Sequence, residues 1–343
     1  MRTRRLVVGA LAAVSCVSAF AKEAPGKQSG PEREAVLAVS CKGDSREPNA
    51  WYVGPYLGYD NNLKPEDFAR DFYCAEQFKS TFYPKGYVTI YGSSSIGEFA
   101  SLFKSNAQAD GFDKTAVEKE YSRIYAEVMT FAYLWSKEYG QHHQYPIMTG
   151  AGPGLMEAGS RGAHDAGLSI GYTTYYDKKL STDTSPHGWG GVPGFVKYPL
   201  QAEPEAQQVI TSEGLIFSSV SARETAMILH SAAIVIAPGG AGTEWETFQI
   251  LEMTKSHQLR PVPIYFIGEQ YHWESLNDRI KDMEDRGTLK KGVITLEHAN
   301  CPADLVKRIS ERLGLRAVKL GVDVCSNKSD YEQKALKVMQ LMQ

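Results

Sequence analysis

A glycine-rich segment in the C-terminal half of the chain has the composition of an anion-binding loop. It reads Pro-Gly-Gly-Ala-Gly-Thr-Glu-Trp-Glu over residues 238–246, between an apolar run at 232–237 and a helical pattern. The apolar run predicts a buried strand, so the glycines join a strand to the start of a helix. Glycines let the backbone approach a ligand, and a helix start directs N–H groups and a positive dipole end at an anion. The residues expected to bind a phosphate are Gly239, Gly240, Ala241, Gly242 and Thr243.

Two charged residues near predicted helix starts could carry chemistry, and each also has a structural explanation. Glu246 lies one turn into its helix, where a carboxylate could act on a bound substrate, but Thr243-x-x-Glu246 also fits a capping box. Ser221-x-x-Glu224 fits the same capping pattern. Arg223 is either a solvated residue or the partner of an anionic ligand, because the helix dipole disfavours a cation at that end. Both pairs of alternatives stay open.

A second glycine loop, Gly-Ala-Gly-Pro-Gly at 150–154, follows a predicted strand at 145–149. Its spacing is Gly-x-Gly-x-Gly rather than the Gly-x-Gly-x-x-Gly of dinucleotide sites, and no convincing ribose-binding acid follows about 20 residues later. A dinucleotide cofactor is therefore disfavoured, and we expect no cofactor. The absence of a Gly-Lys-Ser/Thr sequence excludes a P-loop nucleotide hydrolase.

Strands and helices must position these loops, and from residue 86 the pattern alternates regularly between the two. Continuous apolar strands between amphipathic helices indicate a parallel sheet covered on both faces. We therefore predict an α/β fold with a Rossmann-like, doubly wound parallel sheet, whose ligands bind outside the carboxyl ends of the strands. The expected strands are 87–91, 145–149, 168–172, 214–218, 232–237, 262–267 and 293–296, and the expected helices are 115–139, 155–166, 222–231, 244–256, 273–284 and 302–313.

Composition divides the chain into four expected parts. Residues 1–21 are a signal peptide, and 22–85 form an irregular N-terminal extension rich in Pro, Gly, Asn and charge. Residues 86–315 form the Rossmann-like domain, in which the Pro- and Gly-rich segment 174–211 is an insertion or lid. Residues 316–343 are a polar tail that ends in a helix.

The N-terminus predicts export to the periplasm or the medium. Arg2, Arg4 and Arg5 precede an apolar stretch that ends in Ala19-Phe20-Ala21, a small-x-small cleavage site after Ala21. The alternatives are an uncleaved anchor, or lipidation at Cys16, whose surroundings match a lipobox poorly. After cleavage we expect no stable membrane span. The formal net charge of −3 then becomes −3 − 3 = −6, and without a basic block we expect no nucleic-acid partner.

Four cysteines remain after cleavage, and an even number in an exported protein suggests two disulfides. Three connectivities are possible, of which we expect the local pairs Cys41–Cys74 and Cys301–Cys325. The cysteines and histidines lack zinc-site spacing, and His142-His143 reads as a turn before a strand. We therefore expect no metal.

Taken together, the motifs resemble the LOG (LONELY GUY) family. The resemblance covers about residues 86–313, and the Pro-Gly-Gly-x-Gly-Thr-x-x-Glu run is its most specific part. The stretches that carry it are Tyr91-Gly92-Ser93-Ser94, Thr149-Gly150-Ala151-Gly152-Pro153-Gly154-Leu155-Met156-Glu157-Ala158, Ser221-Ala222-Arg223-Glu224 and residues 238–246.

The resemblance implies a phosphoribohydrolase that splits the N-glycosidic bond of a nucleoside 5′-monophosphate, such as a cytokinin riboside monophosphate or AMP. It implies Arg223 and Glu246 as the catalytic pair, with Arg223 holding phosphate or orienting Glu246. It also implies a homodimer or a higher homo-oligomer. The residues expected to border the nucleotide are Ser93, Gly150, Gly152, Gly154 and Glu157.

The chain departs from the family at Glu224, because the family usually has Arg-Lys where this chain has Arg223-Glu224. Export is also unusual for this mostly cytosolic family. The alternative to an enzyme is therefore an exported module of the same fold that binds nucleotides without turnover. Many members were once described as lysine decarboxylases, but this chain has no His-Lys pair of the kind that holds pyridoxal phosphate.

Overall fold

The structure is a computed structural model whose chain divides into two units, the second of which is Cys41–Gln343. All described residues lie in the second unit. They are 41, 49–57, 60–96, 114–140, 144–175, 197–199, 207–209, 211–292, 297–299 and 301–317. The expected signal peptide and the expected tail helix lie outside the described residues. None of the described helices is both long and apolar enough to cross a membrane.

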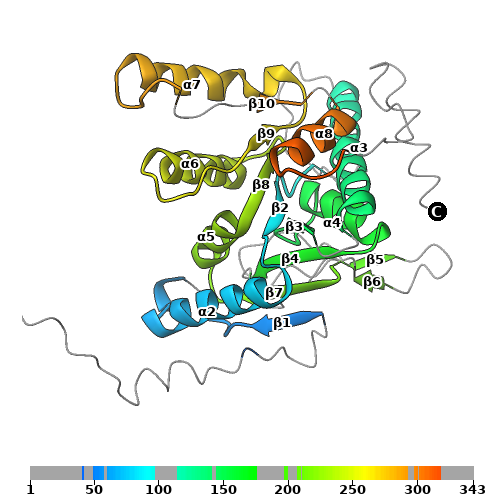
Figure 1. Ribbon diagram of the computed structural model, residues 1–343, viewed down its shortest axis with the longest axis vertical. Helices are drawn as coiled ribbons and strands as arrows, with labels where there is room; N and C mark the ends of the chain where they lie inside the picture. Colours follow the sequence, from blue (N-terminus) through cyan, green and yellow to red (C-terminus); the bar gives the residue numbers. More distant parts are fainter. Residues whose placement is uncertain are drawn as a thin grey trace, which may run out of the picture. The chain divides into compact units, whose positions relative to one another are not determined.

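The second unit is built on an eight-stranded sheet in which all pairings are parallel (Figure 1). The strand order is β1-β7-β4-β3-β2-β8-β9-β10. The strands are β1 (Ala50–Val53), β2 (Tyr87–Tyr91), β3 (Ile147–Thr149), β4 (Ser169–Thr174), β7 (Glu213–Phe217), β8 (Ser231–Ile236), β9 (Ile264–Phe266) and β10 (Glu297–His298).

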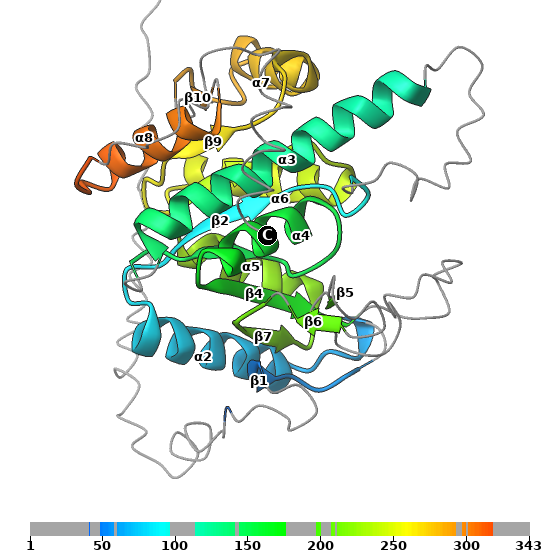
Figure 2. The same ribbon diagram turned by 90° about the vertical axis from the view of Figure 1, so that its right-hand side faces the viewer.

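Helices cover both faces of the sheet, which confirms the predicted doubly wound fold. The helices are α2 (Pro65–Phe82), α3 (Lys114–Glu138), α4 (Leu155–Asp165), α5 (Val220–His230), α6 (Ala241–Lys255), α7 (Glu274–Asp285) and α8 (Pro302–Arg312), with short 3-10 turns η1 (Asp60–Asn62) and η5 (Gln270–Trp273). In Figure 1, α3, α4 and α8 lie on one side of the sheet and α2, α5, α6 and α7 on the other. Figure 2 shows α3 running across the first of these faces.

Alternate side chains of the central strands pack into the two helical layers. Val88 and Ile90 of β2 join Val235 of β8 in one core cluster with residues of α3, α4 and α8. Tyr87, Thr89 and Tyr91 point to the opposite face, because successive strand residues alternate sides. Both faces of β2 are fully buried, which explains why its sequence is apolar without alternation.

The direction of strand addition reverses beside β2. From β2 the chain adds β3, β4 and β7 on one side, and α5 then carries it back to β8 on the other side of β2. Such a switch point opens a crevice at the carboxyl ends of the strands. The loops after β2, β3 and β8 all start at this edge, and they contain the residues expected to bind substrate.

The expectation that residues 22–85 form an irregular extension is wrong for the part that the structure describes. β1 pairs in parallel with β7 at the sheet edge, and α2 packs against α5 on the sheet. Pro65 starts α2, a position where proline fits, and Cys74, Ala75 and Phe78 are buried on its inner face. The apolar residues of α2 therefore recur at helical spacing, within a segment whose overall content of Pro, Gly, Asn and charge suggested a loop.

Two other sequence expectations, at 174–211 and 293–296, fall partly or wholly outside the described residues. The segment 174–211, expected to be a loop, contains the antiparallel pair β5 (Lys197–Pro199) and β6 (Gln207–Val209). The strand expected at 293–296 lies outside the described residues, and β10 follows at 297–298.

The structure contains a Cys41–Cys74 disulfide, one of the two expected pairs, which ties the chain before β1 to α2. Cys301 is also disulfide-bonded. Its expected partner, Cys325, lies outside the described residues.

A buried carboxylate on α2 connects this helix to β1 and to the end of β7. The Asp71 side chain is 0% exposed, and its oxygens accept hydrogen bonds from Tyr52 Oη (2.7 Å), Ser218 N (2.8 Å) and Ser218 Oγ (2.9 Å). Tyr52 belongs to β1, and Ser218 follows β7. One side chain therefore joins three elements.

We predict that Asp71→Ala lowers the free energy of unfolding by about 3 kcal/mol, because buried donors lose their acceptor. Urea unfolding of the mature protein measures this change. The matched control is Asp278→Ala on the exposed side of α7, which should change stability by less than about 0.5 kcal/mol. Equal effects of the two substitutions would contradict the role given to Asp71.

Candidate functional site

Arg223 lies in the first turn of α5 and is buried. Ser219 caps this helix, since its Oγ accepts a hydrogen bond from the N–H of Ala222 at 3.1 Å. The alternative that Ser221 and Glu224 form a capping box is therefore wrong. Arg223 is 4% exposed, which also rules out the solvated alternative.

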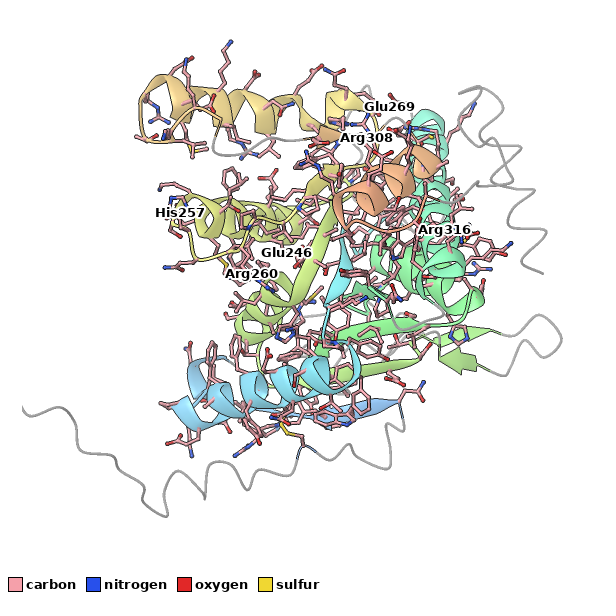
Figure 3. The ribbon with its side chains drawn as sticks, viewed as in Figure 1. Glu246, His257, Arg260, Glu269, Arg308 and Arg316 are labelled. Carbon is pink, nitrogen blue, oxygen red and sulfur yellow. A yellow bond between two sulfur atoms is a disulfide. The ribbon has the colours of Figure 1, made fainter. Side chains whose placement is uncertain are left out.

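Glu246 is not a helix cap. α6 begins at Ala241 with Gly240 as its N-cap, so Thr243 and Glu246 lie within the helix and no side chain caps it. The Glu246 side chain points inward, is only 8% exposed as a residue, and lies between α5 and α6 (Figure 3). Its Oε1 is 3.5 Å from Nη2 of Arg223. The two residues expected to form the catalytic pair are thus in contact.

Glu224 joins this pair and makes a closer contact with Arg223 than Glu246 does. Its Oε1 lies 2.6 Å from Nη2 of Arg223, and the residue is 3% exposed. We call Arg223, Glu224 and Glu246 the arginine cluster. The sequence indicated Glu224 as a candidate helix cap and as a departure from the family pattern, and the departure was the signal that pointed to this contact.

The arginine cluster contains one cation and two carboxyl groups in a dry environment. The pKa of Glu246 is raised to about 8, and burial is the largest cause. The charge of Arg223 lowers this pKa, and the charge of Glu224 raises it. Burial also raises the pKa of Glu224, against the opposing effect of Arg223. One proton shared by the two carboxyl groups makes the cluster neutral, and this is the state that burial favours.

Two neighbouring residues shape the surroundings of the cluster. Tyr91, at the end of β2, is 1% exposed, and burial together with the nearby Glu246 raises its pKa well above the usual value. Gly150 leaves room for the arginine, because a Cβ at this position would lie 2.6 Å from Nη1 of Arg223 and 2.8 Å from Sδ of Met156. This glycine therefore serves the packing of Arg223.

The loop before α6 is open to solvent. Gly239, Gly240, Ala241 and Gly242 are exposed, while Thr243 is buried. A Cβ at Gly239 would collide with Thr243, at 2.1 Å from its Oγ1, so that glycine is required by packing. Added Cβ atoms at Gly240 and Gly242 would meet nothing within 4 Å. At these two positions the protein leaves open space beside the first N–H groups of a helix.

Backbone hydrogen bonds hold three loops together at the switch point. The N–H of Ser93 donates to the carbonyl of Pro238 at 3.2 Å, and the N–H of Leu155 donates to the carbonyl of Ser93 at 2.9 Å. Gly154 has φ +70°, and a Cβ there would lie 2.4 Å from the carbonyl oxygen of Ser93. Ser93 therefore connects the two glycine loops.

The remaining expected site residues lie on the β3–α4 segment. Gly152 is buried in the loop. Glu157 lies in the first turn of α4, where its Oε1 accepts a hydrogen bond from Tyr125 Oη of α3 at 3.1 Å. This contact is on the sheet face opposite α5 and α6. The structure thus brings Arg223 and Glu246 together and places Glu157 against α3.

No group of three or more His, Cys, Asp or Glu side chains among the described residues is arranged to hold a metal ion. His142 and His143 lie outside the described residues.

Residues 156–309 match the model of the family described as "Possible lysine decarboxylase". The match covers a little less than half of the chain. This description is the older one of the LOG family, which the motifs resemble. The matched region contains Arg223, Glu224 and the loop at 238–246, and begins just after the Gly150–Gly154 loop. A search of curated proteins gave no match.

Two solved structures match this chain at low sequence identity. The structural-genomics target TM1055 is 15% identical, with a TM-score of 0.39, and the match covers 66% of this chain and 99% of that one. The molybdenum cofactor binding protein from the phototrophic bacterium Rippkaea orientalis is 18% identical, with a TM-score of 0.35, over 56% of this chain and 88% of that one.

The raised pKa of Glu246 predicts a specific dependence of stability on pH. The folded value is about 8 and the ordinary value is 4.5, so between them only the unfolded chain loses this proton. Stability therefore falls as pH rises through that window. Glu246→Gln removes the titration, and we predict that the variant gains more than ~1.4 kcal/mol over wild type between pH 5 and pH 8.

Urea unfolding at both pH values measures this gain. Glu244→Gln, an exposed position on the same helix, is the matched control and should show no such pH dependence. A difference between Glu246→Gln and wild type that stays constant from pH 5 to pH 8 would refute the prediction.

Proposed function

We propose that this protein hydrolyses the N-glycosidic bond of a nucleoside 5′-monophosphate, giving free base and ribose 5-phosphate. The observation that carries the proposal is the contact between buried Arg223 and Glu246, at 3.5 Å, next to an open and uncapped helix start. A phosphate site and a carboxyl group one turn apart suit a substrate that has a phosphate close to its reacting carbon.

The 5′-phosphate would bind the N–H groups at the start of α6. Helix N-termini bind phosphate because their first N–H groups lack partners within the helix and the dipole is positive there. The open space at Gly240 and Gly242 supports this placement. The ribose would then extend from the loop toward Glu246.

The reaction breaks the bond between the sugar carbon and the base nitrogen, and water adds to the carbon. Positive charge develops on the sugar as the bond breaks, so a carboxyl group beside it can stabilise the charge or transfer a proton. Arg223 would hold Glu246 in position, since its planar guanidinium can contact two acids at once. Glu246→Gln keeps the shape of the side chain and should therefore affect turnover more than folding. Loss of Arg223 should also lower stability, because two buried carboxyl groups lose their cation.

One observation favours the second candidate function, nucleotide binding without turnover. Arg223 contacts Glu224 at 2.6 Å but Glu246 at 3.5 Å, so its charge is directed more to Glu224 than to the residue expected to act on the sugar. Binding without product would establish this alternative.

Lysine decarboxylation, the reaction named in the family description, is not proposed. Decarboxylation with pyridoxal phosphate needs a lysine held in a Schiff base. The chain has no His-Lys pair that would supply it.

We predict that the mature protein releases free base from AMP or from isopentenyladenosine monophosphate. Glu246→Gln and Arg223→Ala should each reduce release at least about 100-fold, the usual scale for loss of a proton-transferring group. Chromatography of the released base measures the rate, and Glu244→Gln is the control. Tight nucleotide binding with no base released from any nucleoside monophosphate would exclude the enzyme and leave the binding module.

Gly242→Ala tests the phosphate site separately from the chemistry. Alanine favours the helix by about 0.5–1 kcal/mol over glycine, and the added Cβ meets no protein atom, so stability should hold or rise. The Cβ would occupy the space proposed for the phosphate, so binding of AMP should weaken at least about 10-fold. Calorimetric titration measures the affinity, and unchanged affinity would place the phosphate elsewhere.

A further inference from the structure

The contact between Arg223 and Glu224 is unusual because the two residues are neighbours in one helix. Side chains at positions i and i+1 of a helix point about 100° apart and do not normally meet. Here the arginine Nη2 approaches the Glu224 Oε1 to 2.6 Å, and the same nitrogen lies 3.5 Å from Glu246 Oε1. The guanidinium is therefore turned into the space between two carboxyl groups from different helices.

Charge and burial decide the protonation of this cluster. Three ionised groups, each less than one-tenth exposed, would leave an excess negative charge in a dry site. A buried, uncompensated charge costs several kcal/mol, and two nearby carboxyl groups relieve it by sharing one proton. The cluster then holds one guanidinium, one carboxylate and one carboxylic acid.

The distances indicate which carboxyl group keeps the proton. Glu224 makes the shorter contact with the cation and is therefore favoured as the carboxylate. Glu246, farther from Arg223 and interacting with the charged Glu224, is favoured as the acid. The titratable group that faces Glu246 from β2 is Tyr91, whose own raised pKa leaves it neutral. No charge from β2 opposes this arrangement.

We propose that Glu224 is a positioning residue that keeps Glu246 protonated, so that Glu246 is the acid that delivers a proton to the departing base. This inference rests on the proposed function. As the glycosidic bond breaks, its electron pair goes to the base nitrogen, which takes the proton from Glu246. Water adds to the sugar carbon and loses a proton, which restores the Glu246 carboxyl group.

An acid in this position serves a base that departs poorly as an anion. Burial is the largest cause of the raised pKa of Glu246, and Glu224 adds to it. The usual lysine of the family would place a positive charge there that opposes it.

The test follows the Glu246 carboxyl group itself and needs no turnover. Carboxyl signals of protein with ¹³C-labelled glutamate are recorded by NMR from pH 5 to pH 9, and the Glu246 signal is assigned by its loss in Glu246→Gln. In wild type we expect Glu246 to remain protonated at pH 7. A Glu246 that is ionised throughout this range overturns the proposal, whatever the activity.

Glu224→Gln preserves shape and removes the charge. We expect it to lower the apparent pKa of Glu246 by at least one unit and to move the alkaline limb of base release down by the same amount. Glu244→Gln, exposed on α6, is the matched control and should move neither. An unchanged Glu246 titration in Glu224→Gln overturns the proposal. If that variant fails to fold, the titration of Glu246 in the wild type decides.

The two proposals can fail separately. One outcome is a protonated Glu246 whose titration responds to Glu224→Gln, in a protein that releases no base. This outcome would support the shared proton and refute the hydrolase. Base release with an ionised Glu246 would retain the hydrolase and refute the role of Glu224.

Discussion

A buried guanidinium between two carboxyl groups is the interaction on which the rest of the site depends. Arg223 could not stay in a dry environment without an acid beside it, and neither glutamate could stay there without the arginine. The surrounding chain serves this arrangement. Ser219 caps α5 so that Arg223 falls in its first turn, and Gly150 leaves room for the guanidinium. The electrostatics of the cluster therefore shape the local structure as well as any chemistry.

The sheet brings these parts to one place by its topology. Because strand addition reverses beside β2, the loops after β2, β3 and β8 meet at the same edge, and the start of α5 returns to it. Backbone hydrogen bonds from Ser93 and Leu155 then hold the loops at fixed separations. The carboxyl group of Asp71 performs a comparable task away from the site, where it joins β1 and α2 to the end of β7.

Much of this arrangement could be predicted from the sequence, and the failures have physical reasons. The strand–helix alternation followed from apolar patterning, and the pairing of Arg223 with Glu246 was implied by the resemblance to the LOG family. β1 was missed because it is a short edge strand, and α2 was missed because the Pro, Gly, Asn and charge of the whole segment outweighed its apolar residues at helical spacing. The capping box failed because Gly240, rather than Thr243, precedes the first turn of α6. The pairing of Glu224 with Arg223 was hidden because adjacent helical residues rarely meet.

The proposed anion site at the start of α6 lies one turn before the Glu246 carboxyl group. A crystal structure of the mature protein with ribose 5-phosphate, the proposed product, tests this most directly. We expect the phosphate on the backbone N–H groups of residues 240–243 and the anomeric carbon beside the Glu246 carboxyl group. Ribose 5-phosphate bound at another place, or a sugar that points away from Glu246, would contradict the account.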